Sequence, residues 1–291
     1  MAHVTDRAAA EESSGAGRSV AAVDHPFVTL ASIVLVGGVL AGGARISAVA
    51  LLVGVAAVQA LVTLSWTIGT AVPGRNGTVL VGAMAAAGAD VAVWVWPGGQ
   101  LGTLLPVFGL AVPVMFVVQL MRAAARVRVV ESLAGVTFLI FVVVSPAAYL
   151  QLRHEFTAAH IGGTVVSGVV LATAGALLVG LLVDLVMPAP RFDPAADRGL
   201  LAVVASAGLG GSIGHLALGS NAGFLAGRGA FVGAACGALA GLLAVAIAFV
   251  RVSAPEPESA AGRGLRSVLP AVVPLSLVAP VGFLLCLAVR A

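Results

Sequence analysis

Residues 161–187 read IGGTVVSGVVLATAGALLVGLLVDLVM, and Asp184 is the one ionisable residue among them. An apolar run of about 20 residues is long enough to cross the hydrocarbon core of a bilayer as a helix. The whole chain of 291 residues has the same character, with 60% hydrophobic and 9% charged residues, whereas soluble domains carry roughly 25% charged residues. The solvent for most of this chain is therefore predicted to be lipid.

Further apolar runs lie on both sides of this stretch and bring the number of predicted spans to nine. They cover residues 26–43, 46–70, 77–97, 101–121, 132–152, 161–187, 199–218, 229–250 and 267–289. Because every backbone amide inside a bilayer needs a hydrogen-bond partner, such runs form helices. The sequence predicts an all-α, polytopic transmembrane bundle over residues 26–291, preceded by a polar, disordered cytoplasmic tail over residues 1–25.

The placement of arginine predicts the orientation of the bundle. The 15 basic residues are all arginine, and 11 of them fall in the tail and in alternate loops, while Arg45, Arg153, Arg228 and Arg290 fall on the other side. Since cytoplasmic loops keep an excess of positive charge, the N-terminus is predicted to be cytoplasmic. A lysine-free composition rich in Ala, Val, Gly and Leu favours a bacterial cytoplasmic membrane. The scattered arginines argue against a nucleic-acid partner.

Small residues recur at helical spacing in several runs. The clearest series is Gly229, Gly233, Gly237 and Gly241, and the pairs Gly38 with Gly42 and Gly210 with Gly214 repeat the interval. Small residues four apart let two helices approach closely in lipid. The series predicts close packing inside the bundle, with a homodimer or a protein-partner face as the alternative.

Prolines inside the runs predict kinked or interrupted helices. They are Pro106, Pro113, Pro146, Pro270, Pro274 and Pro280. Interrupted helices line the binding sites of many transporters, although kinks also occur in ordinary bundles. Cys236 and Cys286 lie far apart in apolar runs and are predicted to be packing residues.

Three ionisable residues are the candidates for binding a ligand or an ion. Asp90 lies in the third run, Asp184 near the cytoplasmic end of the sixth, and His215 near the outer end of the seventh. An ionisable side chain inside a membrane is costly and marks a functional candidate. The alternatives are an internal hydrogen-bonded pair for Asp90, a helix-end charge for Asp184 and a packing residue for His215. Four further residues are predicted to bond between helices: Gln59, Gln119, Ser65 and Ser145.

The sequence contains no recognisable catalytic motif and no cluster of metal ligands. Neither GxxxxGK[ST] nor HExxH occurs, so neither catalytic residues nor a cofactor are predicted. Arg122, Arg126 and Arg128 lie together in one predicted cytoplasmic loop, where such side chains attract anionic lipids.

In layout the chain resembles phosphatidate cytidylyltransferases, which make CDP-diacylglycerol from CTP and phosphatidate. The resemblance rests on nine spans, the arginine-containing loop after the fourth, Asp184, and the ending GRGLRSVLP at residues 262–270. It implies a metal-dependent lipid enzyme. However, the family's Ser-Pro-Lys-Lys stretch and its Lys-Arg and Lys-Asp pairs have no counterpart, and no acidic residue follows Arg263. These departures imply a non-catalytic relative.

Three function classes follow from these observations. The first is a non-catalytic component of the bacterial envelope that acts through lipid or protein contacts. The second is a secondary transporter or flippase that uses Asp90 together with His215 or Asp184. The third is a CTP-dependent lipid transferase.

Overall fold

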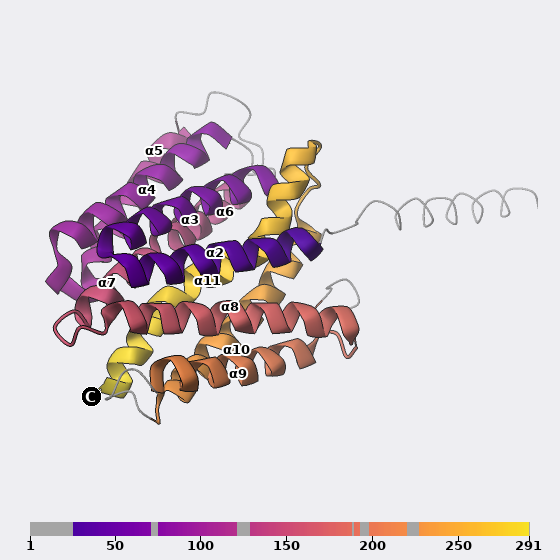
Figure 1. Cartoon of the computed structure of the whole chain (residues 1–291). Coiled ribbons are helices and arrows are strands. Elements are labelled where there is room, and N and C mark those ends of the chain that lie inside the picture. The colour runs from indigo at the N-terminus through magenta and orange to yellow at the C-terminus, as the bar shows by residue number, and fades with distance from the viewer. Residues whose placement is uncertain are drawn as a thin grey trace, which may run out of the picture.

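The computed structural model describes residues 26–70, 75–120, 129–187, 189–192, 198–219 and 227–290. Within these residues, nine helical segments are long and apolar enough to cross a membrane. The chain is an all-α polytopic bundle, as predicted (Figure 1). The N-terminal tail over residues 1–25 and Arg122, Arg126 and Arg128 lie outside the described residues.

The helices follow the predicted runs closely. They are α2 (Pro26–Ile46), α3 (Ala48–Gly69), α4 (Arg75–Val95), the 3-10 helix η1 (Pro97–Leu104), α5 (Leu105–Leu120), α6 (Val129–Val144), α7 (Ala147–Glu155), α8 (Gly162–Val186), α9 (Leu200–Gly214), the π-helical turn η2 (His215–Gly219), α10 (Gly229–Ser253) and α11 (Ala260–Arg290). Three spans are composite, because the fourth joins part of η1 to α5, the fifth joins α6 to α7, and the seventh joins α9 to η2.

The last helix begins earlier than predicted, at Ala260 instead of residue 267. The Ser259 hydroxyl accepts a hydrogen bond from the Gly262 N–H at 3.0 Å. This bond satisfies one of the free amides of the first turn, as N-terminal caps do. The apolar run therefore understates the helix, whose first turns are polar.

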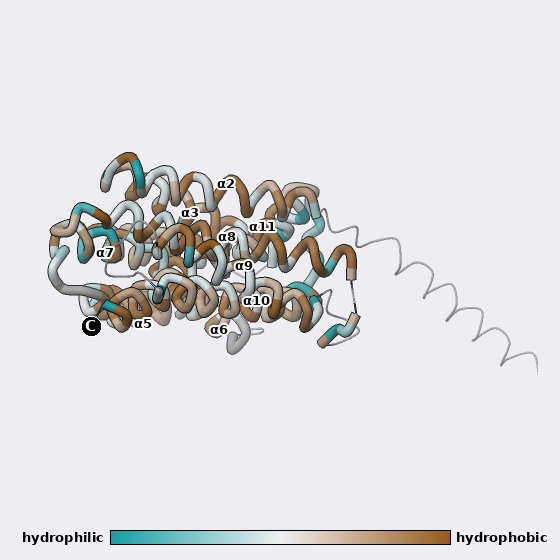
Figure 2. The backbone as a smooth tube through the Cα atoms, turned by 60° about the horizontal axis from the view of Figure 1, so that its bottom comes forward, coloured by the Kyte–Doolittle hydropathy of each residue, from teal (hydrophilic) through white to brown (hydrophobic). Residues whose placement is uncertain are grey.

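Helix α11 is the central element of the bundle. It contacts α2, α3, α6, α7, α8 and α10, and it crosses the other helices obliquely in Figure 1. Hydrophobic residues dominate along the helices, and hydrophilic residues gather mainly towards their two ends (Figure 2). This distribution is the one that a membrane-spanning bundle requires.

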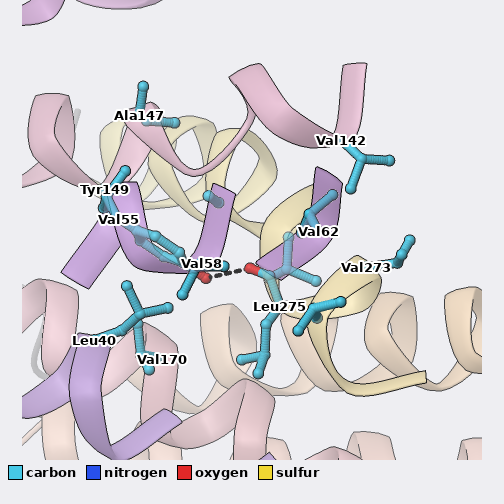
Figure 3. Packing of buried hydrophobic residues seen from close by; sticks show 14 of the residues in the cluster. Leu40, Val55, Val58, Val62, Val142, Ala147, Tyr149, Val170, Val273 and Leu275 are labelled. Carbon is cyan, nitrogen blue, oxygen red and sulfur yellow. Dashed lines mark hydrogen bonds between the residues drawn. The ribbon is translucent and has the colours of Figure 1, made fainter. Parts of the chain in front are cut away.

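The prolines have different effects on the helices that contain them. Pro146 separates α6 from α7, whereas Pro113 lies inside α5 and Pro270, Pro274 and Pro280 lie inside α11. Side chains of other helices bond to the backbone of α11. The Tyr149 hydroxyl donates to the Leu275 carbonyl at 2.8 Å, within a shell of buried aliphatic residues (Figure 3), and the Thr29 hydroxyl donates to the Ser267 carbonyl at 2.7 Å. These two bonds tie α11 to α7 and to α2.

The glycine series of α10 packs against α9. A Cβ added at Gly233 would lie 2.8 Å from the Gly214 Cα, and one at Gly241 would lie 3.2 Å from the Val203 Cα. Gly229 and Gly237 face the backbone of Gly214 and Ser206 in the same way. The series is thus an internal contact between two helices of one chain, in which backbone meets backbone.

Candidate functional site

A polar pair joins α3 to α4 in the interior of the bundle. Gln59 lies midway along α3, and its Nε2 donates to the Asp90 Oδ1 on α4 at 3.1 Å. Gln59 is 1% exposed, and Asp90 is half-buried. The Gln59 Oε1 is buried and has no hydrogen-bond partner in the described part of the chain. Asp90 therefore takes part in an internal hydrogen bond, but the pair is incompletely satisfied.

Small side chains bring the two helices of this pair together. A Cβ at Gly82 of α4 would lie 3.0 Å from the Thr63 Cγ2 of α3, and Ala89 is fully buried. The Thr63 hydroxyl donates to the Gln59 backbone carbonyl at 2.8 Å. The close approach of α3 and α4 therefore places the Gln59 amide within reach of the Asp90 carboxyl.

The opposite side of α4 borders an apolar pocket of about 240 Å³. One wall of the pocket is formed by residues of α4 and Trp96, from Val81 onward, and the other wall by residues of η1 and α5, from Thr103 to Val114. Several lining side chains are exposed on the outside of the bundle, including Leu110 (66%), Val91 (59%) and Met84 (50%). The pocket therefore opens sideways, towards the lipid that surrounds a spanning helix pair.

The polar atoms of the pocket lie near one end. Trp96 and Thr103 are the lining residues whose side chains carry nitrogen or oxygen, and the Thr103 hydroxyl accepts a hydrogen bond from the Gln151 Nε2 at 3.0 Å. Asp90 and Gln59 do not line the pocket. The pocket thus offers an apolar slot and not a polar binding site.

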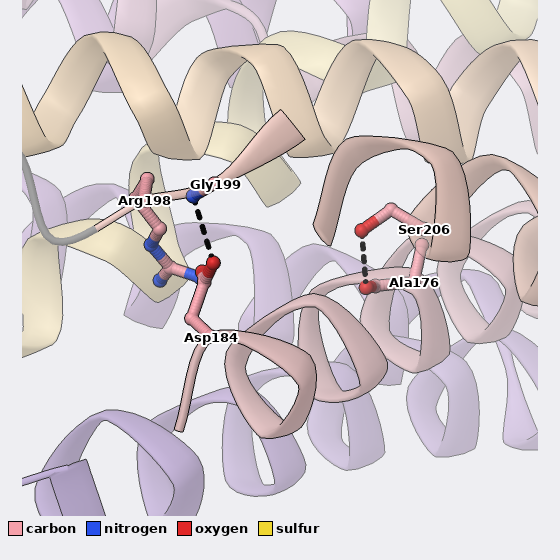
Figure 4. Close-up of polar contacts among 5 residues, drawn as sticks. All are labelled: Ala176, Asp184, Arg198, Gly199 and Ser206. Carbon is pink, nitrogen blue, oxygen red and sulfur yellow. Dashed lines mark hydrogen bonds and ion pairs between the residues drawn. The ribbon is translucent and has the colours of Figure 1, made fainter. Parts of the chain in front are cut away.

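Asp184 forms a buried ion pair at the end of α8. Its Oδ2 lies 2.9 Å from the Arg198 Nη1, and its Oδ1 accepts the Gly199 N–H at 2.8 Å (Figure 4). The Arg198 and Asp184 side chains are 10% and 6% exposed. Because both carboxylate oxygens have partners, this residue ties α8 to the start of α9.

His215 lies far from Asp184 along α9. Gly199 immediately precedes the first residue of α9, whereas His215 follows the last of its 15 residues. At 1.5 Å per residue, the two ends of α9 are about 22 Å apart. His215 is exposed on the surface of the bundle. The three candidate residues Asp90, Asp184 and His215 thus lie in three different local environments.

The four arginines on the predicted outer side are all engaged within the chain. Arg153 Nη1 donates to the Ala44 carbonyl and Arg228 Nη1 donates to the Val289 carbonyl at 2.6 Å. Ala44 and Val289 lie in the last turns of α2 and α11, where carbonyls lack helical partners and cations are favourable. The other two pairs are Arg45 with Ser167 at 2.7 Å and Arg290 with Glu155 at 2.7 Å. These contacts were not predictable from the sequence, because the partners of the arginines are backbone atoms or lie far away along the chain.

Arg266 plays a similar part on the predicted cytoplasmic side. It donates to the carbonyls of Arg251, Ala254 and Pro255, which lie at the end of α10 and just beyond it. This guanidinium therefore caps α10.

Two of the four predicted interhelical hydrogen bonds are wrong. Ser65 donates to the Val62 carbonyl of its own helix, and Ser145, directly after α6, donates to the Phe141 carbonyl of α6, as serines in spanning helices often do. Gln59 bonds between helices, and the Gln119 side chain lies outside the described residues. Cys236 and Cys286 are free and buried.

No group of three or more His, Cys, Asp or Glu side chains that could hold a metal ion occurs in the described part of the chain. Comparison with protein-family models, with curated proteins and with solved structures finds no match to this chain. The function must therefore be argued from the chain itself.

Proposed function

We propose that this chain is a non-catalytic integral protein of the bacterial cytoplasmic membrane that acts by holding a membrane lipid. The observation that carries the proposal is the sideways-opening pocket between α4 and α5. An apolar cavity of about 150 Å³ stays dry and can hold benzene, so the larger volume of 240 Å³ suits part of an acyl chain. Pockets for drug-sized ligands run from about 300 Å³ upward and carry several polar groups.

The lipid belongs to the outer leaflet. The arginine bias of 11 to 4 supports a cytoplasmic N-terminus, which puts Trp96 and Thr103 at the outer end of the pocket. Tryptophan favours the membrane–water interface. The acyl chain then runs from Trp96 inward to Val81 and Val114, with its headgroup at the outer surface.

Lipid-dependent stability tests this proposal. A ligand that binds the folded state raises its unfolding temperature, so adding a glycerophospholipid to the detergent-solubilised chain should raise Tm. Gly88→Leu should abolish the rise, because a Cβ there already meets Val107 of α5 at 3.5 Å and a larger side chain fills the pocket. Gly109→Leu is the matched control, since Gly109 of α5 faces open space. Equal rises in all three chains would contradict the proposal.

Secondary transport or lipid flipping through Asp90 is the second candidate function, and the Asp90–Gln59 pair favours it. If the chain is such a transporter, proteoliposomes that contain it should take up protons under an imposed membrane potential. Asp90→Asn should abolish this uptake although the variant still inserts into the membrane. Uptake that is unchanged in the variant would exclude this role for Asp90.

We propose that the chain is a non-catalytic relative of phosphatidate cytidylyltransferases. The resemblance rests partly on Asp184. The ion pair of this residue with Arg198 supports a structural role for it. The chain incubated with CTP, phosphatidate and magnesium should then yield no CDP-diacylglycerol. Formation of CDP-diacylglycerol would show instead that the chain is a CTP-dependent lipid transferase.

A further inference from the structure

Each residue of the Gln59–Asp90 pair has a polar group that lacks an interaction partner. The Gln59 Oε1 is a buried acceptor without a donor among the described residues, and Asp90 forms no ion pair with any of them. An unpaired acceptor and an uncompensated carboxylate are both unfavourable away from water. A bound species between the two side chains would supply a donor to the Gln59 Oε1 or a positive charge to the Asp90 carboxylate.

Among the described residues of the elements that contact α4, none forms an ion pair with Asp90. Elements α3, η1 and α5 contain no charged residue, and α6 contains Glu131, whose side chain lies outside the described residues. The ionisable residues of α7 are Tyr149, Arg153, His154 and Glu155. Of these, Tyr149 donates to the Leu275 carbonyl, Arg153 to the Ala44 carbonyl, and Glu155 pairs with Arg290. His154 forms no ion pair with Asp90.

The remaining charge on α4 is also distant. Arg75 begins this helix, 15 residues before Asp90, which corresponds to about 22 Å along the axis. A metal ion would need several further oxygen ligands, and the described residues provide no cluster of three or more acidic, histidine or cysteine side chains. A proton needs only the two groups that are present.

We propose that Asp90 and Gln59 form an intramembrane proton-binding site, in which the Asp90 carboxyl carries a proton and donates it to the Gln59 Oε1. The amide and the acid then face each other through two hydrogen bonds. The Gln59 Nε2 donates to the Asp90 Oδ1, as observed, and the protonated Oδ2 donates to the buried Oε1. One proton thus removes the charge and satisfies the orphan acceptor. This site is independent of the acyl-chain pocket, because neither residue lines the pocket.

Isotope-edited infrared spectroscopy tests the proposal directly. The full chain is prepared in phospholipid vesicles with ¹³C in the side-chain carboxyl of aspartate, and spectra are recorded at neutral pH with and without sodium. We expect a carbonyl band of a protonated aspartic acid that is absent from Asp90→Asn. In Gln59→Leu the band should move to higher frequency or disappear, because the acid loses its acceptor.

Several results would overturn the proposal. A spectrum without a protonated-aspartate band, or with a band that persists in Asp90→Asn, would show that Asp90 does not hold the proton. A carboxylate band of Asp90 that shifts with sodium concentration would assign the site to a cation instead.

A stability comparison keeps the test independent of misfolding. Asn at position 90 supplies an N–H donor in place of the acid proton, so Asp90→Asn should unfold at nearly the same temperature as the native chain. Asp90→Leu should unfold earlier, because the Gln59 amide then loses both partners. Equal destabilisation by Asn and Leu would contradict a donor at Asp90.

Discussion

Asp184 and Arg198 form a buried ion pair in which each charge has a specific partner. The two side chains are 6% and 10% exposed, and Asp184 also accepts the Gly199 N–H. Removing one partner of a buried pair leaves an uncompensated charge, which costs far more than the net value of the pair. The two charges should therefore be strongly coupled.

Arg198→Met should destabilise the chain by about 3–5 kcal/mol. The double variant Asp184→Asn/Arg198→Met should lose clearly less, because the neutral Asn still accepts from Gly199 and no charge stays buried. The free energy of unfolding in mixed detergent micelles measures both effects. A double variant as unstable as Arg198→Met would show that the loss of stability does not come from the charge left on Asp184.

Residue-level chemistry was partly visible in the sequence. Asp90 stood out as an ionisable residue inside an apolar run, and Asp184 as a charge near a helix end. That Gln59 lies opposite Asp90, and that Arg198 lies opposite Asp184, depends on how two helices are rotated about their axes. A single sequence does not contain that rotation, because many residues on each helix are similar in hydrophobicity.

Contact between α9 and α10 depends on glycine. Gly233 approaches the Gly214 Cα so closely that an added Cβ would lie 2.8 Å from it. Gly208, in the same helix pair, faces open space. The same substitution at the two positions should therefore have opposite effects.

Gly233→Ala should destabilise the bundle by about 1–3 kcal/mol, as overpacking does. Gly208→Ala should be neutral or stabilise it by up to about 1 kcal/mol, since alanine is the better helix former. Unfolding of the two variants and the native chain in detergent measures the difference. Similar effects at both positions would contradict the close packing of α9 on α10.

The helices themselves were largely predictable, because an apolar run in lipid has few alternatives to a helix. The departures arise where local polar chemistry decides. Ser259 caps α11 and starts it before the apolar run begins, and Pro146 divides the fifth span into α6 and α7. The pocket was not predicted, since it depends on how α5 leans against α4.

The whole molecule is predicted to cross the membrane with its N-terminus in the cytoplasm. Glu256 lies between α10 and α11 on the predicted cytoplasmic side, and Ala158 lies between α7 and α8 on the other side; both are exposed. Cysteines placed at these sites should react differently with a membrane-impermeant maleimide.

Ala158→Cys should be labelled in intact cells, and Glu256→Cys only after the cells are permeabilised. The native chain is the control, because Cys236 and Cys286 are buried. The reverse pattern of labelling would invert the orientation and move the pocket to the inner leaflet.

The central claim is that the chain retains a lipid between α4 and α5, and native mass spectrometry of the gently purified protein tests it most directly. The native chain and Gly109→Leu should each carry a bound glycerophospholipid that survives detergent removal, whereas Gly88→Leu should lose it. A lipid that stays bound to all three chains, or that is lost equally from both variants, would contradict the claim.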